Sequence, residues 1–452
     1  MQHDLTQGSI TGKLLGMAAF IGIGLVFQTL YFLIDLYFVA GIGPSAIAGV
    51  GLAGNAFFLV MAATQMVGVG ALSLIARAIG GKRIDEADAV FRQSMILSLG
   101  LSLLTLAAGY GLAGGGLRLL SADSATAGQG LRYLQGFLPA LALMFPNNAM
   151  ASALRAAGVV RPTMLVQSGT VVLNAILAPV LIAGWGTGLP LGVFGAGLAS
   201  SIAALAGLLG ILWVFGRSQT LIAHPLRMPR LDFGICRRII GIGLPSAAEF
   251  LLMFITSAVV YGVIRHFGSA AQAGYGVGSR VMQAVFLPAM AVAFAVAPMA
   301  GQNFGAGRAD RVRRTVRDAA VISSALMLCL TLLCQLRPQV LIGVFAHDPD
   351  VIAVGTGFLR IISLNFLATG LIFTASGAFQ ALGDTRPALI GSVSRLLTFA
   401  VPALWLSTQP WARIEYVWWL SATSVLIHAM IALVLVRMQL KSKLAPLLLA
   451  GV

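Results

Sequence analysis

The chain has 452 residues, of which 58% are hydrophobic and only 10% are charged, and its mean hydropathy is +0.93. A soluble domain normally carries about 25% charged residues, so this composition excludes a water-soluble protein of this size. The net charge of +15 does not indicate nucleic-acid binding, because the basic residues are not interleaved with aromatic or base-reading groups.

The apolar residues occur in runs that are long enough to cross a bilayer. A spanning helix needs about 20 apolar residues, and only helices or closed barrels satisfy the backbone in lipid. Strand-type alternation is absent, so the fold class that we expect is all-α, with about twelve transmembrane helices. The expected spans are residues 15–40, 47–75, 93–116, 132–154, 163–183, 192–215, 240–265, 276–300, 318–336, 354–380, 388–408 and 415–437.

The placement of the basic residues between these spans predicts the orientation. With the N-terminus inside, 21 of the 29 Lys and Arg residues lie in inside loops or tails and six lie outside. This bias follows the positive-inside rule and predicts that both termini are cytoplasmic. We expect a multi-pass protein of the cell inner (plasma) membrane that contacts lipid and functions as a monomer.

The chain contains an internal repeat, in which each residue of the first copy corresponds to the residue 225 positions further on in the second. We call this distance the repeat offset. Three stretches align with their equivalents at this offset without a gap: 43–51 with 268–276, 80–92 with 305–317, and 153–162 with 378–387. Because six helices enter and leave on the same side, the two copies are expected to be parallel repeats (6+6), as in secondary transporters. We predict an N-lobe at 1–222 and a C-lobe at 223–452, with a central cavity between them.

Two of the 14 acidic residues fall well inside the expected spans. An acid at this depth is a functional candidate by default, and Asp35 shares one helical face with Gln28 and Tyr31. Its alternative role is a hydrogen bond to a neighbouring helix. Glu249 lies four residues after Pro245, where a functional role and simple exposure to water at a helix start are equally compatible with the pattern.

Three amides lie in the fourth and fifth expected spans, namely Asn147, Asn148 and Asn174. Buried amides often only bond across helices, so their role depends on their distance from Asp35. The glycine pattern at 49–54 follows no strand and favours close helix packing over nucleotide binding.

The sequence indicates neither an enzyme nor a cofactor. The three Cys and five His residues have no ligand spacing, so we expect no metal site and no cofactor. The G-x-x-x-x-G-K-[ST] motif of ATPases is absent. An ion gradient, of H⁺ or Na⁺, or a partner protein therefore has to supply the energy.

Several motifs in order resemble those of one transporter family. These are Gln28–Asp35, Gly80–Ala87, Leu154–Gly158 with Arg161–Pro162, Leu173-Asn174 with Leu181-Ile182, Leu191–Ser200, Pro298–Gly307 and Gly383–Pro387. The chain resembles the multidrug and toxic compound extrusion (MATE) transporters along nearly its whole length. The resemblance implies an antiporter for multidrug efflux and xenobiotic export, which expels drugs or toxic metabolites, often cationic or aromatic, against inward H⁺ or Na⁺ flow.

The resemblance also assigns expected cation-coupling residues. Asp35 matches the family's carboxylate in the first helix, Gln28 and Asn174 match other members of the polar network, and Ser200 stands where threonine is usual. The family commonly has a second carboxylate four residues after the asparagine, where this chain has Ala178. It also often has a proline at the position of Phe20. A proton needs only one carboxylate, whereas Na⁺ prefers several oxygen ligands, so we favour H⁺ coupling.

The expected mechanism is alternating access by rocking of the two lobes, with protonation of Asp35 permitting drug release. Candidate cavity walls are Phe57, Met61, Phe145, Phe286, Met290 and Phe294, for which lipid contact or core packing is the alternative. A flippase for lipid-linked oligosaccharide or another lipid-like substrate is the alternative function. It should have a more cationic cavity than Arg280 and Arg395 provide. A membrane-embedded enzyme or sensor would need a metal, nucleophile cluster or soluble domain, and none is visible.

Overall fold

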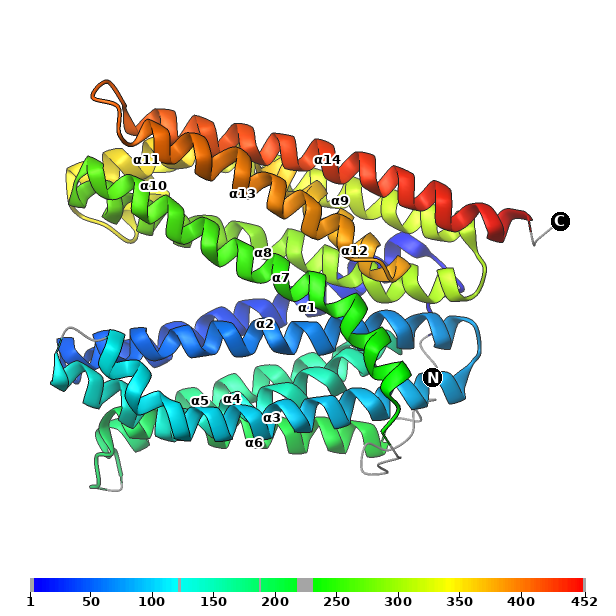
Figure 1. The fold of residues 1–452 in the computed structure, drawn as a ribbon, viewed down its shortest axis with the longest axis horizontal. Coiled ribbons are helices and arrows are strands. Elements are labelled where there is room, and N and C mark those ends of the chain that lie inside the picture. Colours follow the sequence, from blue (N-terminus) through cyan, green and yellow to red (C-terminus); the bar gives the residue numbers. More distant parts are fainter. Residues whose placement is uncertain (1–3, 121–122, 187, 218–230, 450–452) are drawn as a thin grey trace. The chain divides into compact units, whose positions relative to one another are not determined.

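The computed structural model describes residues 4–120, 123–186, 188–217 and 231–449, apart from the side chains of residues 31–33, 35–36, 118–120 and 448–449. The described elements are helices (Figure 1): α1 Ile10–Ala40, α2 Pro44–Gly80, α3 Ile84–Leu120, α4 Ser124–Ala156, α5 Arg161–Ala183, α6 Gly192–Arg217, α7 Phe233–Ile264, η1 Arg265–Phe267, α8 Ser269–Gly305, α9 Ala309–Leu336, α10 Pro338–Gly343, α11 Pro349–Ser363, α12 Phe366–Leu382, α13 Arg386–Leu406 and α14 Ile414–Leu449.

The expectation of about twelve spans is confirmed. Eleven described helices are long and apolar enough to cross a membrane, and the number is twelve when α11 and α12, which are bent by 57° at a short break, are counted as one span. The bend replaces the straight span expected at 354–380. The ninth span begins earlier than expected, at Ala309, because the basic first turns of α9 continue the helix beyond its apolar part. The short helix α10 was not predicted.

Backbone conformation at equivalent turns confirms the internal repeat. Three pairs of residues with positive φ are related by the repeat offset: Gly43 (140°) with Gly268 (94°), Lys82 (57°) with Gly307 (72°), and Gly158 (79°) with Gly383 (72°). Left-handed backbone is costly for residues with a Cβ, so glycine is favoured at such turns. The matched glycines of the repeat therefore preserve the chain reversals between spans.

Contacts within the chain define two compact units. Unit 1 holds Met1–Asp4 and Ile23–Ala247, and unit 2 holds Leu5–Gly22 and Ala248–Val452. The helix α1 therefore contributes its first part to unit 2 and the rest to unit 1, and α7 does the reverse. Gly22 and Ala247, where the two helices change units, are themselves related by the repeat offset. The predicted lobes, 1–222 and 223–452, differ from these units by the first parts of α1 and α7.

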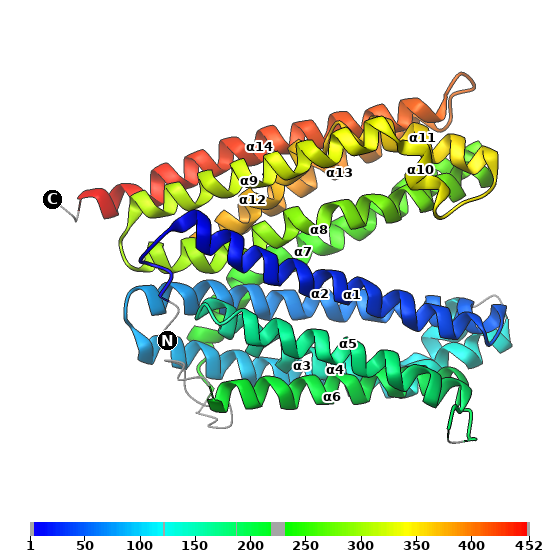
Figure 2. The same cartoon turned by 180° about the vertical axis from the view of Figure 1, so that it is seen from behind.

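Unit 1 is built around α4, which packs against α2, α3 and α6, while α5 packs on α6 (Figure 2). Glycines permit a close approach of α4 and α6. A Cβ on Gly136 would lie 2.6 Å from the carbonyl oxygen of Phe194, and one on Gly197 would lie 2.5 Å from that of Tyr133. Asp123 caps α4, since its carboxylate accepts the Thr126 N–H at 2.6 Å. This bond, with a second from the Thr126 hydroxyl, holds the pKa of Asp123 below its usual range.

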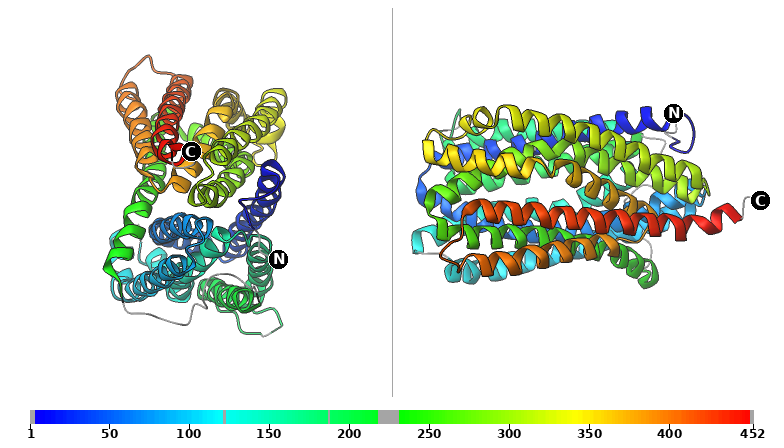
Figure 3. Two further views of the ribbon diagram at one scale, coloured as in Figure 1. Left: turned by 90° about the vertical axis from the view of Figure 1, so that its right-hand side faces the viewer. Right: turned by 90° about the horizontal axis from the view of Figure 1, so that it is seen from above.

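Unit 2 places α8 against α9, α11 and α12, and α13 pairs with α14 (Figure 3). Its apolar core contains an aromatic group. The ring of Tyr275 stacks on Trp418 with centroids 5.8 Å apart, and Phe358 meets both rings edge-on. This core holds the ends of α8, α11 and α14 together.

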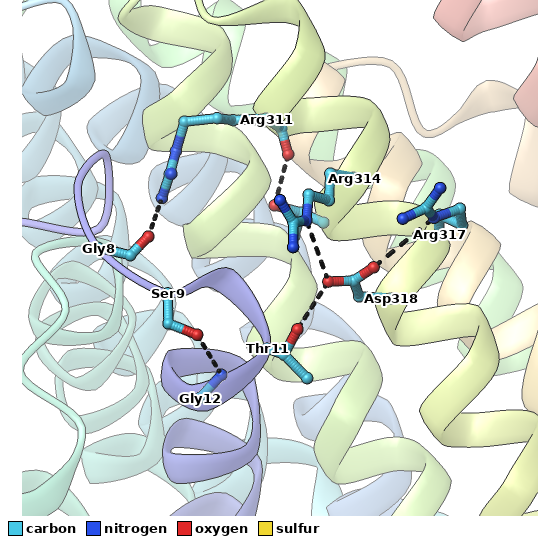
Figure 4. Close-up of polar contacts among 9 residues, drawn as sticks. Gly8, Ser9, Thr11, Gly12, Arg311, Arg314, Arg317 and Asp318 are labelled. Atoms are coloured by element: carbon cyan, nitrogen blue, oxygen red, sulfur yellow. Dashed lines mark hydrogen bonds and ion pairs between the residues drawn. The ribbon is translucent and has the colours of Figure 1, made fainter.

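A segment before and at the start of α1 attaches to α8 and α9 within unit 2. We call residues 5–12 the N-terminal strap. Its polar contacts, partly drawn in Figure 4, are Leu5 N–H to Gln302 Oε1 (3.1 Å), Asn303 Nδ2 to Leu5 O (3.2 Å), Arg308 Nη1 to Thr6 O (2.6 Å), Arg311 Nη2 to Gly8 O (3.1 Å) and Thr11 Oγ1 to Asp318 Oδ2 (2.8 Å). The basic start of α9 thus binds the carbonyls that precede α1.

Candidate functional site

The structure brings two of the predicted site residues together in unit 1. Asn174 of α5 and Ser200 of α6 are fully buried, at 0% and 1% exposure, and Asn174 Nδ2 donates to Ser200 Oγ at 3.4 Å. Close packing positions them, since a Cβ on Gly195 would collide with the backbone of Leu181 on α5. The amide oxygen of Asn174 is buried and has no partner among the described residues.

An unpaired buried carbonyl oxygen is uncommon and costly, because it has lost its bonds to water. Such an oxygen can accept a hydrogen bond from a protonated carboxyl or contribute one ligand to a cation. Ala178, which lies one helical turn after Asn174, is fully buried as well. The immediate surroundings on α5 therefore offer neutral oxygens and no second carboxylate.

The other predicted coupling residues lie on α1 in its unit 1 part. The side chains of Asp35 and Tyr31 are outside the part of the chain that the structure describes. Gln28 is described and is exposed. Their spacing of three, four and seven residues places all three on one helical face.

The neighbouring amides of α4 bond to the backbones of other helices. Asn147 Nδ2 donates to the carbonyl of Ala204 on α6 at 3.1 Å, and Asn148 Nδ2 donates to that of Thr64 on α2 at 2.8 Å. Each amide therefore makes a hydrogen bond across helices, as buried amides in membrane proteins often do. Asn147 also keeps a buried amide oxygen without a partner.

Glu249 in unit 2 has a partner that the sequence did not indicate. Ser376 of α12 donates its hydroxyl to Glu249 Oε2 at 3.4 Å, and Glu249 is half-buried. The residue equivalent to Ser376 in the first repeat is Ala151, so the offset gave no signal for this contact. The carboxylate lies one turn after Pro245, which is inside α7.

The candidate wall residues differ in burial. Phe145 is 2% exposed and packs as core, whereas Phe57, Met61, Phe286, Met290 and Phe294 are half-buried. Phe57 lies against Phe137, with centroids 6.4 Å apart, and Phe286 meets Phe366 edge-on at 5.3 Å. Phe137 covers part of the Phe57 ring, and Phe366 covers part of the Phe286 ring. Both contacts are compatible with core packing and with a place in a cavity wall.

Among the described residues, no group of three or more His, Cys, Asp and Glu side chains is arranged to hold a metal ion. The polar groups gathered here are a neutral pair in unit 1 and a carboxylate–hydroxyl pair in unit 2. Both suit proton or ion exchange and the binding of polar ligands more than bond-breaking chemistry.

Sequence comparisons connect both repeats to proteins of known type. The MatE family pattern matches residues 21–180 and 245–406. The multidrug export protein MepA of Staphylococcus haemolyticus (strain JCSC1435) is 27% identical over 406 residues, which cover 88% of this chain and 86% of that protein. MepA of Staphylococcus aureus (strain MSSA476) is 25% identical over 403 residues, with 88% and 87% covered. The probable multidrug resistance protein YpnP of Bacillus subtilis (strain 168) is 24% identical over 417 residues, with 92% and 91% covered.

Solved structures show the same fold. A MOP superfamily transporter from Pyrococcus furiosus superposes with a TM-score of 0.90 at 24% identity, covering 97% of this chain and 98% of its own. A MATE structure in the straight conformation superposes with a TM-score of 0.90 over the same shares, and one in the bent conformation with 0.88 over 97% of both chains, each at 24% identity.

Proposed function

Because the chain belongs to the MatE family of multidrug and toxic compound extrusion transporters, we propose that it exports varied small molecules in exchange for inward-moving cations. The substrates are drugs or toxic metabolites, often cationic or aromatic. Relatives named as multidrug export proteins and the eleven or twelve apolar spans support this proposal.

The coupling cation in this proposal is H⁺ rather than Na⁺. The buried Asn174–Ser200 pair, with the unpaired amide oxygen of Asn174, is the observation that carries it. A neutral acceptor of this kind suits a protonated carboxyl, and Asp35 is the proposed carboxyl. Because Ala178 has no carboxylate, the proposed site lacks the second negative charge that would favour Na⁺, a hard cation that prefers several oxygen ligands. Gln28 and Tyr31 complete the proposed polar face.

The proposed mechanism is alternating access of the two lobes. Protonation of Asp35 from outside weakens drug binding and permits release, and deprotonation towards the cytoplasm restores the drug site. Such coupling requires that proton and drug favour different states. Glu249 with Ser376, and the half-buried Phe57, Met61, Phe286 and Met290, are the proposed substrate contacts. Phe145 is not among them, because its side chain is only 2% exposed.

The proposed setting is the cell inner (plasma) membrane, with both termini cytoplasmic and the protein acting as a monomer. The bias of 21 basic residues to six supports this orientation. A reporter fused to either terminus that is active only in the cytoplasm will then be active in both fusions. Inactivity of both fusions would show the reversed orientation, and activity in one fusion alone would contradict the even number of spans.

Ethidium export from vesicles with an imposed pH gradient tests the proposal. Asp35→Asn is expected to reduce export at least ~10-fold, because the amide cannot exchange the coupling proton. Asp85→Asn is the matched control, since Asp85 is exposed at the start of α3, and it should export as the wild type does. Wild-type rates for Asp35→Asn would reject the role of Asp35. Export driven by a Na⁺ gradient without a pH gradient would reject H⁺ coupling.

A further inference from the structure

An arginine that forms no ion pair with any described residue lies near the middle of α13 in unit 2. Arg395 is half-buried, and its Nε is buried without a hydrogen-bond partner among the described residues. At ~1.5 Å per residue, Arg395 lies roughly 14–16 Å from either end of this spanning helix. Cations at such depth are rare because of their desolvation cost, and they usually pair with a carboxylate or mark a substrate pathway.

A buried histidine packs against the same helix. His428 of α14 is 4% exposed, and its Nδ1 is buried without a partner among the described residues. Gly391 on α13 makes room for the imidazole, since a Cβ there would lie 2.6 Å from His428 Cδ2 and Nε2. Arg395 follows Gly391 by four residues, so it lies one turn further along the helix face that meets His428.

The surrounding helices do not neutralise this pair. In the described part of the chain, α12 and α13 contain no acidic residue, and α14 carries only Glu415, in its first turn. Asp384, which precedes α13, accepts a hydrogen bond from Gln439 Nε2 at 2.8 Å. No described ion pair includes Arg395 or His428. No described carboxylate therefore pairs with either of these two nitrogen groups.

An aromatic group of unit 2 joins α8 to α14, the helix that carries His428. The ring of Tyr275 on α8 stacks on Trp418 of α14 and meets that of Tyr261 edge-on with centroids 4.9 Å apart. Tyr275 is enclosed by Trp418 and Phe358, whereas Tyr261 is 40% exposed. The Tyr261 ring thus leaves a surface against which a planar ligand can pack.

We propose that Arg395 and His428 form an anion subsite in unit 2 that holds the carboxylate of an aromatic substrate. The guanidinium supplies paired N–H donors to the two carboxylate oxygens, and the imidazole supplies one further donor. The inference rests on the proposed export function and extends it from cationic compounds to aromatic zwitterions and anions.

Binding of two matched dyes to the purified full-length protein in nonionic detergent tests the subsite. Rhodamine 110 carries a free carboxylate, and rhodamine 123 is its methyl ester. Arg395→Gln should weaken rhodamine 110 binding about tenfold, the size of one lost charge-assisted contact, and change rhodamine 123 binding less than about twofold. His428→Gln should give a smaller selective loss, and Arg395→Lys should retain part of the affinity.

Arg437→Gln is the control, because Arg437 is an exposed arginine of α14 in the same unit, more than two turns beyond His428. It should leave both dyes unchanged. The proposal is overturned if Arg395→Gln affects both dyes equally or neither, or if Arg437→Gln reproduces its effect. If Arg395→Gln does not fold, competition on the wild type decides: displacement of rhodamine 110 by benzoate supports the subsite, and displacement only by phosphatidylglycerol overturns it. Dye binding needs no ion gradient, so failure of wild-type ethidium export would refute the proposed function separately.

Discussion

Gln93 and Asp318 occupy equivalent positions in the two repeats, and each accepts a hydrogen bond from the segment that begins α7 or α1. Gln93 Oε1 accepts the backbone N–H of Asp232 at 3.1 Å, and Asp318 Oδ2 accepts the Thr11 hydroxyl at 2.8 Å. The duplication thus preserves an anchor for the first helix of each repeat. Its chemistry differs, since an amide serves in unit 1 and a carboxylate in unit 2.

The Thr11–Asp318 contact should stabilise the N-terminal strap. The Asp318 side chain is only 13% exposed and lies 3.7 Å from Arg314 Nε and from Arg317 Nε. Thr11→Val should lower the unfolding temperature in detergent by about 2–5 °C, as expected for loss of one hydrogen bond to a charged group. Thr11→Ser keeps the hydroxyl and should behave as the wild type.

A double-mutant cycle isolates this contact. Thr11→Val and Asp318→Asn should show a coupling of about 1–3 kcal/mol if the two side chains interact. Simple additivity of the two substitutions would contradict the proposed anchor.

Gly243 should be required for the packing of α7 in unit 1. A Cβ at this position would overlap the backbone carbonyl of Met66 on α2, whereas nothing lies within 4 Å of a Cβ on Gly241. Because backbone cannot move aside as a flexible side chain can, Gly243→Ala should cost about 1–3 kcal/mol, as overpacking usually does. Gly241→Ala should be neutral or slightly stabilising. Equal unfolding temperatures for the two variants would contradict the close approach.

Substitutions of the neighbouring residues Ser200 and Ser201 are expected to have different effects, on ion coupling in the first case and on stability in the second. Ser200→Ala leaves the Asn174 amide without its acceptor and should reduce proton-driven export, whereas Ser200→Thr retains the hydroxyl and should export normally. Ser201 instead donates to the carbonyl of Gly136 at 2.6 Å and accepts the N–H of Ala140 at 3.0 Å.

Ser201→Ala should therefore lower the free energy of unfolding by about 1–3 kcal/mol, because these hydrogen bonds are lost, and with it the unfolding temperature. The pH profile of export should not change. Vesicle transport at several pH values and thermal unfolding measure both properties. A shifted pH profile in Ser201→Ala, with none in Ser200→Ala, would reverse the assignment.

Gly383→Ala tests the left-handed turn that ends α12. Gly383 has φ of 72°, so an alanine should cost about 1–2 kcal/mol there. Gly357, which is inside α11 with nothing within 4 Å of its Cβ position, is the control. Its alanine should stabilise the helix slightly, because alanine is the better helix former. A tolerated Gly383→Ala would show that this turn accepts another conformation.

The sequence predicted the spans, and through the family resemblance it named Asn174 and Ser200 among the expected cation-coupling residues, but it did not predict the hydrogen bond between them. It did not predict the Ser376–Glu249 contact, because Ser376 resembles many small polar residues in spanning helices and its repeat equivalent is Ala151. It also gave no reason to connect His428 with Arg395. These residues belong to two different helices, and only the helix packing at Gly391 places them together.

The sequence by itself determined that this chain lies in a membrane as two six-helix repeats, because apolar length and a fixed offset are properties of the chain. The tertiary structure alone decided where α1 and α7 change units, that α11 and α12 are bent by 57° relative to each other, and which buried polar atoms lack partners among the described residues. Those features depend on how helix faces pack, and packing depends on shape complementarity between residues far apart in the chain. In lipid, such contacts replace the hydrophobic effect as the source of specificity between helices.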